Sequence, residues 1–143
     1  MSQLTEHSTA RTKILALENE IAKLPSIDCP LKHYFADGVY VRQIFMPAGT
    51  FITGKIHLHE HVNVVSMGRI TCYTEEGRKE IHGPDTFITP PGTKRALYIH
   101  EDTIWTTIHK LRGESDRDIA DIEKDYVVET YSEFDMKFLE HLS

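Results

Sequence analysis

Three histidines at every second position are the residues whose types and spacing most clearly indicate chemistry. His57, His59 and His61 stand in a stretch that otherwise alternates like a β-strand. Alternate residues of a regular strand point to one face, so the three imidazoles would share a side with Lys55 and Asn63. Imidazole is the commonest transition-metal ligand in proteins and titrates near neutral pH. The stretch therefore indicates a binding pocket, whereas a single histidine would more often be a hydrogen-bonded core residue.

The elements that must position these side chains are short strands. Between Tyr34 and Leu111 the sequence is rich in β-branched and aromatic residues, and glycine or proline interrupts it at short intervals. Many short strands with closely spaced turns favour a sandwich or a small barrel. The expected strands are residues 38–46, 50–52, 55–66, 69–74, 79–81, 86–88, 95–99 and 103–111.

Helices are expected on both sides of these strands. Residues 8–24 carry an apolar stripe with helical spacing, and Pro25 ends it. The stripe can pack on its own domain or on a second copy of the chain, and its spacing favours neither. Further helices are expected over residues 116–126 and from about Ser132. The chain then divides into an N-terminal helix and linker (1–33), a barrel (34–112) and a C-terminal helical extension (113–143).

Length and composition exclude several classes of protein. The 143 residues suit one domain with one hydrophobic core. A formal net charge of −6 argues against nucleic-acid binding. Cys29 and Cys72 lie far apart in the sequence, which favours free thiols. No apolar run approaches the ~20 residues that span a bilayer, so we expect a cytoplasmic protein without membrane association.

The glycines around the histidines have a recognisable spacing. Gly49 is followed by five residues, then by Lys55-Ile56-His57, three residues, His61, six residues and Gly68. This spacing resembles the first motif of the cupin superfamily, whose members fold as jelly-roll (double-stranded β-helix) barrels. In this register Lys55 replaces the first metal-binding histidine, His57 is the second, and His61 replaces the glutamate.

A second register is also open. It takes His57 and His59 as the histidine pair, but Asn63 then stands at the glutamate position and the final glycine comes two residues early. The register anchored on both glycines fits every spacing. His59 is the weakest metal candidate of the three, because in that register it does not hold a cupin ligand position.

The second cupin motif is recognisable but altered. Gly83 is followed by six residues, Pro90-Pro91-Gly92, two residues and Arg95. Arg95 stands where the last metal histidine belongs, and an arginine offers a metal no lone pair. The resemblance spans roughly residues 37–111 and implies a mainly β, single-domain cupin jelly-roll barrel with an N-terminal helix and C-terminal helices. A weaker similarity is to small cupin-like proteins of tailed bacteriophages.

A third imidazole can complete a metal site. Residues 95–99 and 103–109 are expected to form a hairpin that turns at residues 100–102. If the strands pair symmetrically, Arg95 faces Thr107, and His109 points to the same face. His57, His61 and His109 would then bind a divalent transition metal such as zinc, iron, nickel or manganese. Regular alternation points Glu60 away, and only a bulge would turn it inward.

Lys55 and Arg95 suggest a second kind of ligand. If both point inward, two cations beside the imidazoles favour a carboxylate or phosphate held by charge-assisted hydrogen bonds, with His59 and Asn63 in the same row. Alternatively, one or both cations pair with an interior carboxylate or extend out of the barrel mouth.

The function expected from these residues is binding of a small, anionic molecule in a His-rich cupin pocket, with or without a metal, in a homo-oligomer of two or more copies. If the protein is an enzyme, a metal-dependent isomerase, lyase or oxygenase fits equally well. Two other functions stay open: a metal-free binding or sensing module that uses the histidines as proton switches, and an assembly protein whose barrel is only a scaffold. The fold alone does not decide among these functions, because barrels of this kind occur in proteins with many different functions.

Overall fold

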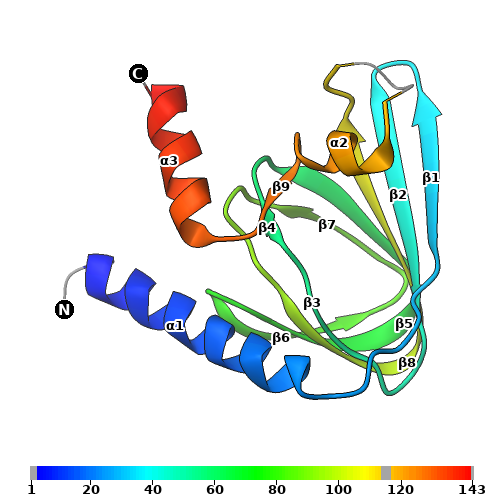
Figure 1. The fold of residues 1–143 in the computed structure, drawn as a ribbon. Coiled ribbons are helices and arrows are strands. Elements are labelled where there is room, and N and C mark those ends of the chain that lie inside the picture. The colour runs from blue at the N-terminus through cyan, green and yellow to red at the C-terminus, as the bar shows by residue number, and fades with distance from the viewer. Residues whose placement is uncertain (1–2, 114–116, 143) are drawn as a thin grey trace.

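The computed structural model describes residues 3–113 and 117–142. Its strands form a seven-stranded antiparallel sheet that curves into a barrel and a separate two-stranded sheet, with helices near both ends of the chain (Figure 1). In chain order the elements are α1 (Gln3–Ala22), β1 (Leu31–Ala36), β2 (Val39–Met46), β3 (Phe51–Thr53), β4 (Ile56–His57), β5 (His61–Thr74), β6 (Gly77–His82), β7 (Asp85–Thr89), β8 (Ala96–Lys110), α2 (Ile119–Glu123), β9 (Val127–Val128) and α3 (Tyr131–Leu142).

Two long strands, β5 and β8, hold the barrel together because each runs through both of its walls. In one wall β5 pairs with β7, and β8 pairs with β2, which in turn pairs with β1. In the other wall β5 pairs with β6, and β8 pairs with β3. The two long strands also pair with each other, with register shifts between Val65 and Ile70. The mainly β barrel expected from the sequence is therefore confirmed.

The close crossing of β5 and β8 requires a glycine. Gly68 has a φ of +122°, a conformation that L side chains rarely adopt, and a Cβ there would lie 2.8 Å from the Cα of Thr103. Thr103 is itself fully buried. The final glycine of the first motif thus allows the two walls to meet.

The core between the walls is apolar. Its buried side chains come from β2, β5, β6 and β8, and they pack as inward-facing alternate residues of facing sheets do. They are Met46, Val65, Ile70, Cys72, Ile81, Ile99 and Trp105.

Two expected strand patterns are wrong. The continuous strand over residues 55–66 is interrupted, because β4 ends at His57, the chain bends through residues 58–60, and β5 begins at His61. The hairpin over residues 95–109 does not form, since β8 continues through residues 100–102. Thr107 pairs with Arg42 and Asn63 rather than with Arg95. Because β5 accompanies β8 along its length, both halves of β8 have ladder partners and need no turn.

The helices also differ in extent from the sequence expectation. α1 begins earlier, at Gln3, and packs on its own barrel through fully buried Ile14, although Leu17 and Leu24 stay 37% and 46% exposed. The helix expected over residues 116–126 is only the five-residue α2, followed by β9, which pairs with β4; residue 116 lies outside the described residues. No described helix is both long and apolar enough to cross a membrane.

The expected homo-oligomer stays a prediction. Leu15 on α1 and Met136 and Leu139 on α3 leave large apolar side chains at the surface of these helices.

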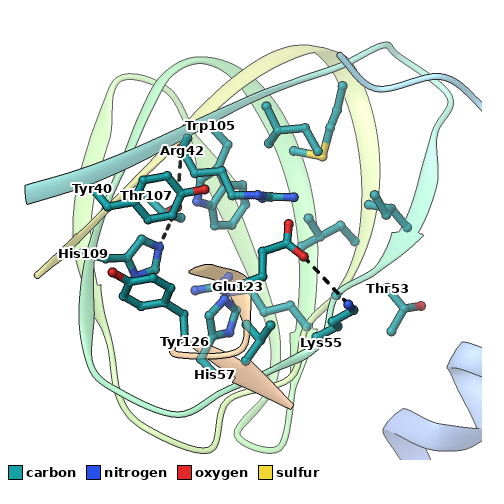
Figure 2. Close-up of a pocket in the computed structure, with 17 residues that line it drawn as sticks. Tyr40, Arg42, Thr53, Lys55, His57, Trp105, Thr107, His109, Glu123 and Tyr126 are labelled. Carbon is teal, nitrogen blue, oxygen red and sulfur yellow. Dashed lines mark hydrogen bonds and ion pairs between the residues drawn. The ribbon is translucent and has the colours of Figure 1, made fainter. Parts of the chain in front are cut away.

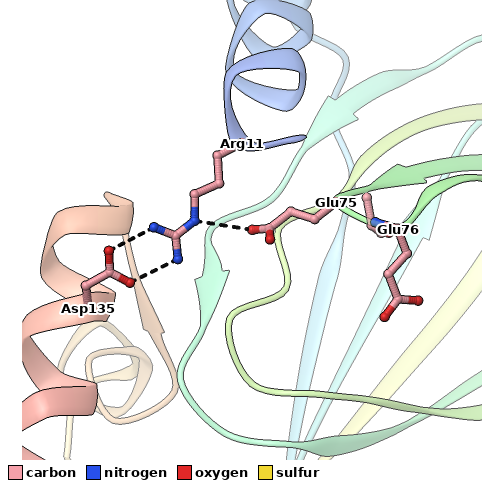
Figure 3. Close-up of polar contacts among 5 residues, drawn as sticks. Arg11, Glu75, Glu76 and Asp135 are labelled. Atoms are coloured by element: carbon pink, nitrogen blue, oxygen red, sulfur yellow. Dashed lines mark hydrogen bonds and ion pairs between the residues drawn. The ribbon is translucent and has the colours of Figure 1, made fainter. Parts of the chain in front are cut away.

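One arginine joins the two terminal helices to the barrel (Figure 3). Arg11 on α1 donates two hydrogen bonds to the carboxylate of Asp135 on α3, at 2.8 and 2.9 Å. Its Nε lies 3.7 Å from a carboxylate oxygen of Glu75, in the turn between β5 and β6. The guanidinium also lies 4.3 Å from the ring centroid of Tyr131. A bidentate pair of this kind fixes the orientation of the two side chains as well as the distance between them.

Candidate functional site

A cavity of about 290 Å³ opens inside the barrel (Figure 2). Four parts of the chain line it: β2, the stretch from β3 to β4, β8 with the residues just before it, and the segment from α2 to β9. In Figure 2, Tyr40, His57, His109 and Tyr126 lie on one side, Thr53 and Lys55 lie on the other, and the guanidinium of Arg42 extends between them.

Strand alternation explains which side chains reach the cavity. On β2, every second residue from Tyr40 to Met46 lines it, and on β8 the same is true from Trp105 to His109. This is the two-residue period of a pleated strand, in which alternate side chains point to one face. Trp105 and His109 also pack against the rings of neighbouring residues inside the barrel.

The three histidines expected to form a metal site do come together. The ring centroids of His57 and His61 are 4.5 Å apart, and those of His61 and His109 are 4.7 Å apart. His57 and His61 meet because the bend between β4 and β5 brings both rings to the same region. His109 arrives on β8, opposite Tyr40 of β2. Its inward position is thus a consequence of one continuous strand, not of a hairpin.

All three imidazoles are held in the neutral form. Burial, followed by the charge of Arg95, lowers the pKa of His57 well below its usual range and that of His61 to about 4. Burial, followed by His61, lowers the pKa of His109 to about 3. Desolvation disfavours the charged form of a histidine, and a nearby cation adds to this effect. The site therefore contains neutral rings at physiological pH.

The hydrogen bonds of the three rings bear on metal binding. His57 Nδ1 lies 3.1 Å from the carbonyl oxygen of Thr93, and His109 Nε2 lies 3.0 Å from Thr107 Oγ1. The buried Nε2 of His61 has no hydrogen-bond partner in the part of the chain that the structure describes. Neutral imidazoles with a free nitrogen are suitable donors for zinc, iron, nickel or manganese. However, the neighbouring rings pack against one another at tilts of 36° and 31°. Within residues 3–113 and 117–142 no group of three or more metal-ligating side chains is arranged to hold an ion.

Arg95 is a buried cation without a carboxylate. It is only 9% exposed and lines the cavity. Its Nη2 donates to Asn63 Oδ1, at 3.3 Å, and to Thr89 Oγ1, which are neutral acceptors. The guanidinium also lies 5.0 Å from the ring centroid of Trp105. No described carboxylate pairs with it, and burial lowers its pKa to about 10.

Asn63 positions this arginine from outside the cavity. It is fully buried and does not line the cavity. Its Oδ1 accepts hydrogen bonds from Arg95 and from Trp105 Nε1, and its Nδ2 donates to Thr89 Oγ1 at 2.6 Å. The asparagine thereby fixes both an arginine and a tryptophan of the cavity wall. The prediction that Asn63 itself contacts a ligand stays untested.

Lys55 and His59 lie differently from the expected single row. Lys55 stands at the rim, about half exposed, with its Nζ 3.9 Å from carboxylate oxygens of both Glu123 and Glu129. Neither of the two alternatives describes this position alone, because Lys55 reaches the barrel mouth and also faces two carboxylates there. His59 lies in the bend before β5 and does not line the cavity. The bend after His57 takes His59 out of the alternation, whereas Lys55 precedes the bend and lines the cavity together with His57.

Several cavity residues were missed by the sequence analysis. Arg42 and Tyr40 share the inward face of β2 with Ile44 and Met46, so the alternation of this strand was a signal that could have found them. Glu123 and Tyr126 had no such signal, because the segment from α2 to β9 reaches the cavity only through tertiary packing. Lys94, which is 2% exposed, pairs with Glu18 of α1 and does not line the cavity, was also missed.

Comparison with known proteins finds likenesses of structure only. No family model matches this chain, and no curated protein matches it by sequence. A cupin domain from Bordetella pertussis Tohama I is 16% identical, with a TM-score of 0.49 over 61% of this chain and 97% of that one. KdgF from Halomonas sp. is 14% identical, with a TM-score of 0.51 over 63% of this chain and 86% of that one.

A larger protein contains a similar barrel. A mutant salicylate 1,2-dioxygenase from Pseudoaminobacter salicylatoxidans, in complex with gentisate, is 14% identical, with a TM-score of 0.51. The match covers 75% of this chain but 32% of that one. Together with the two walls built on β5 and β8, the two likenesses with TM-scores of 0.51 show that the fold is a jelly-roll barrel of the cupin type. At such low identity they establish the fold and not the activity.

Proposed function

We propose that this cupin barrel binds a small anionic molecule in its cavity. The observation that carries the proposal is the buried charge of Arg95, which faces the cavity and pairs with no described carboxylate. A buried charge is costly unless it is paired, so a site of this kind is expected to gain stability from a bound anion. Among the described residues, acceptors are found for Nη2 of Arg95 alone. Its Nε and Nη1 remain to donate charge-assisted hydrogen bonds to a ligand.

Replacing Arg95 by methionine tests the proposal. We expect Arg95→Met to lose the rise in melting temperature that acetate, benzoate, malonate or phosphate gives the wild type. Without anions, the variant should be at least as stable as the wild type, because an apolar side chain replaces a buried, unpaired charge. Differential scanning calorimetry with each anion measures both quantities.

The matched control for this experiment is Arg78→Met. Arg78 lies on β6, 71% exposed, and pairs with Glu80. This variant should keep the full response to anions. The proposal is wrong if none of the four anions stabilises the wild type, or if Arg95→Met responds to them as the wild type does.

Metal binding by His57, His61 and His109 is the second candidate. The free, buried Nε2 of His61 favours it. The nearby charge of Arg95 and the packing of the three rings against one another count against it. A divalent metal held by these three residues would supply Lewis-acid or redox chemistry in the cavity.

The metal content of untagged protein tests this candidate. If it holds, elemental mass spectrometry should find near one equivalent of a single transition metal in the wild type, and His61→Ala should lose it. His82→Ala, which removes an exposed histidine of β6, should keep the metal. An absence of zinc, iron, nickel and manganese after incubation with each ion would reject a metal site and leave the anion site as it stands.

A further inference from the structure

Two arginines are the cations that the cavity offers to a ligand. Arg42 extends into the cavity from β2 (Figure 2), and no described residue pairs with its guanidinium. Arg95 contributes the second charge from just before β8. Lys55 is engaged at the rim by Glu123 and Glu129. An anion entering the cavity therefore meets one guanidinium without protein acceptors and one with neutral acceptors only.

The aromatic residues of the cavity present ring surfaces rather than polar atoms. The hydroxyl of Tyr40 is 2.8 Å from His33 Nδ1, and the hydroxyl of Tyr126 donates to the carbonyl oxygen of Lys110 at 3.0 Å. Trp105 Nε1 donates to Asn63 Oδ1 at 3.0 Å. Each polar atom thus has a partner inside the protein, and what the three rings offer a ligand is apolar contact.

Five further lining side chains are aliphatic, while His57, His109, Thr53 and Thr107 add polar groups. The five aliphatic side chains come from β2, β3, β8 and β9, and they are Ile44, Met46, Ile52, Leu97 and Val127. Carbon surface of this kind favours a ligand that brings apolar area out of water, at about 25 cal/mol per Å². A volume of about 290 Å³ lies at the lower end of the range for ligand pockets, so the ligand is small.

One carboxylate limits the charge that a ligand can carry. Glu123 lines the cavity, and among the lining residues it is the only acidic one. Its negative charge, which Lys55 at 3.9 Å offsets in part, disfavours a second anionic group at the same end of the cavity. A ligand with one carboxylate avoids this repulsion, whereas a dicarboxylate or a phosphate dianion does not.

From these contacts we infer that the ligand is a small monocarboxylate with an aromatic or branched aliphatic body, and that Arg42 binds its carboxylate. The inference rests on the proposed anion-binding function and specifies its ligand class. The planar guanidinium of Arg42 matches a carboxylate with two parallel hydrogen bonds. The body of the ligand then lies against the aromatic and aliphatic wall.

Isothermal titration calorimetry with a matched series of probes tests the ligand class. Benzoate and isovalerate should bind wild-type protein at least tenfold more tightly than acetate, malonate or phosphate, because only they bury a sizeable apolar body and carry one charge. Benzamide, which has the shape of benzoate without its charge, should bind at least tenfold more weakly than benzoate. Arg42→Gln should weaken the binding of benzoate about tenfold to a hundredfold, which is the effect expected when a hydrogen bond to a charged group is lost.

A second variant tests the apolar wall. Val127→Thr nearly preserves the side-chain shape and adds a hydroxyl to the cavity, so benzoate should bind about fivefold more weakly while acetate is unchanged. Arg78→Gln, on the exposed face of β6, should change the affinity for neither benzoate nor acetate.

The outcomes separate this inference from the proposed function. Equal binding of acetate, malonate, phosphate and benzoate would overturn the ligand class and leave anion binding intact. Unchanged benzoate binding by Arg42→Gln would overturn the role of Arg42. Binding of none of the probes by the wild type would overturn the inference and the proposed function together.

Discussion

Lowering the pH from 7 to 5 is expected to reduce the free energy of unfolding by roughly 1–2 kcal/mol for each of three buried histidines. His57, His61 and His109 are neutral in the folded protein because burial opposes their protonation. Their rings contact one another, so the acid sensitivity is concentrated in one part of the barrel.

The direction of the effect follows from the two sets of pKa values. In the unfolded chain a histidine has a pKa of about 6.5. In the folded chain the pKa of His61 is lowered to about 4 and that of His109 to about 3, mainly by burial. Below pH 6.5 the unfolded chain therefore binds more protons than the folded one. The stability contributed by the neutral rings is complete above pH 6.5 and is lost as the pH falls toward these folded-state values.

Urea unfolding between pH 7.5 and 4.5, in the presence of a chelator, measures this dependence. His109→Gln removes one of the three groups, so its loss of stability on acidification should be about a third smaller than that of the wild type. His82→Gln, at an exposed position, should follow the wild type. Parallel curves for the wild type and His109→Gln would show that protonation of the buried ring does not limit stability.

Breaking the ion pair between α1 and the barrel is expected to cost about 2–3 kcal/mol. Lys94 is 2% exposed, and its Nζ lies 2.8 Å from Glu18 Oε2. Glu18→Gln keeps the size of the side chain but leaves a buried ammonium without its counter-ion. The penalty falls at or below the lower end of the range for buried pairs because the side chain of Glu18 is 36% exposed.

Two further variants make this prediction specific. Glu20→Gln breaks the pair of Glu20 with Lys23, whose side chains are 69% and 70% exposed, and should change stability by less than about 0.5 kcal/mol. Adding Lys94→Met to Glu18→Gln should recover most of the loss, because an apolar side chain then replaces the unpaired charge. Chemical denaturation of the four proteins gives the comparison. If Glu18→Gln and Glu20→Gln both lower the free energy of unfolding by the same small amount, the pair of Glu18 with Lys94 does not hold α1 on the barrel.

The sequence by itself determined the class of fold and the main side chains of the site. The spacing from Gly49 to Gly68 and the many short β-rich segments led to the barrel, because turns and strand alternation are local properties of the chain. The same local reasoning selected His57, His61 and Arg95, which the structure places near one another.

Only the tertiary structure decided how the site is assembled. Residues 100–102 resemble a turn, yet β8 runs through them because β5 supplies ladder partners both before and after them. A break of three residues after His57 removed His59 from the expected row, whereas Lys55, which precedes the break, still lines the cavity with His57. Whether a strand continues or bends depends on the partner strand, which lies far away in the sequence.

Tertiary packing also decided which charged and aromatic residues line the cavity. Glu123 and Tyr126 come from the segment between α2 and β9, which reaches the barrel through burial of Ile122 and pairing of β9 with β4. The buried state of Arg95, without a carboxylate, also depends on which side chains surround it. Burial and charge pairing are set by contacts between distant segments, and local sequence patterns carry no information about them.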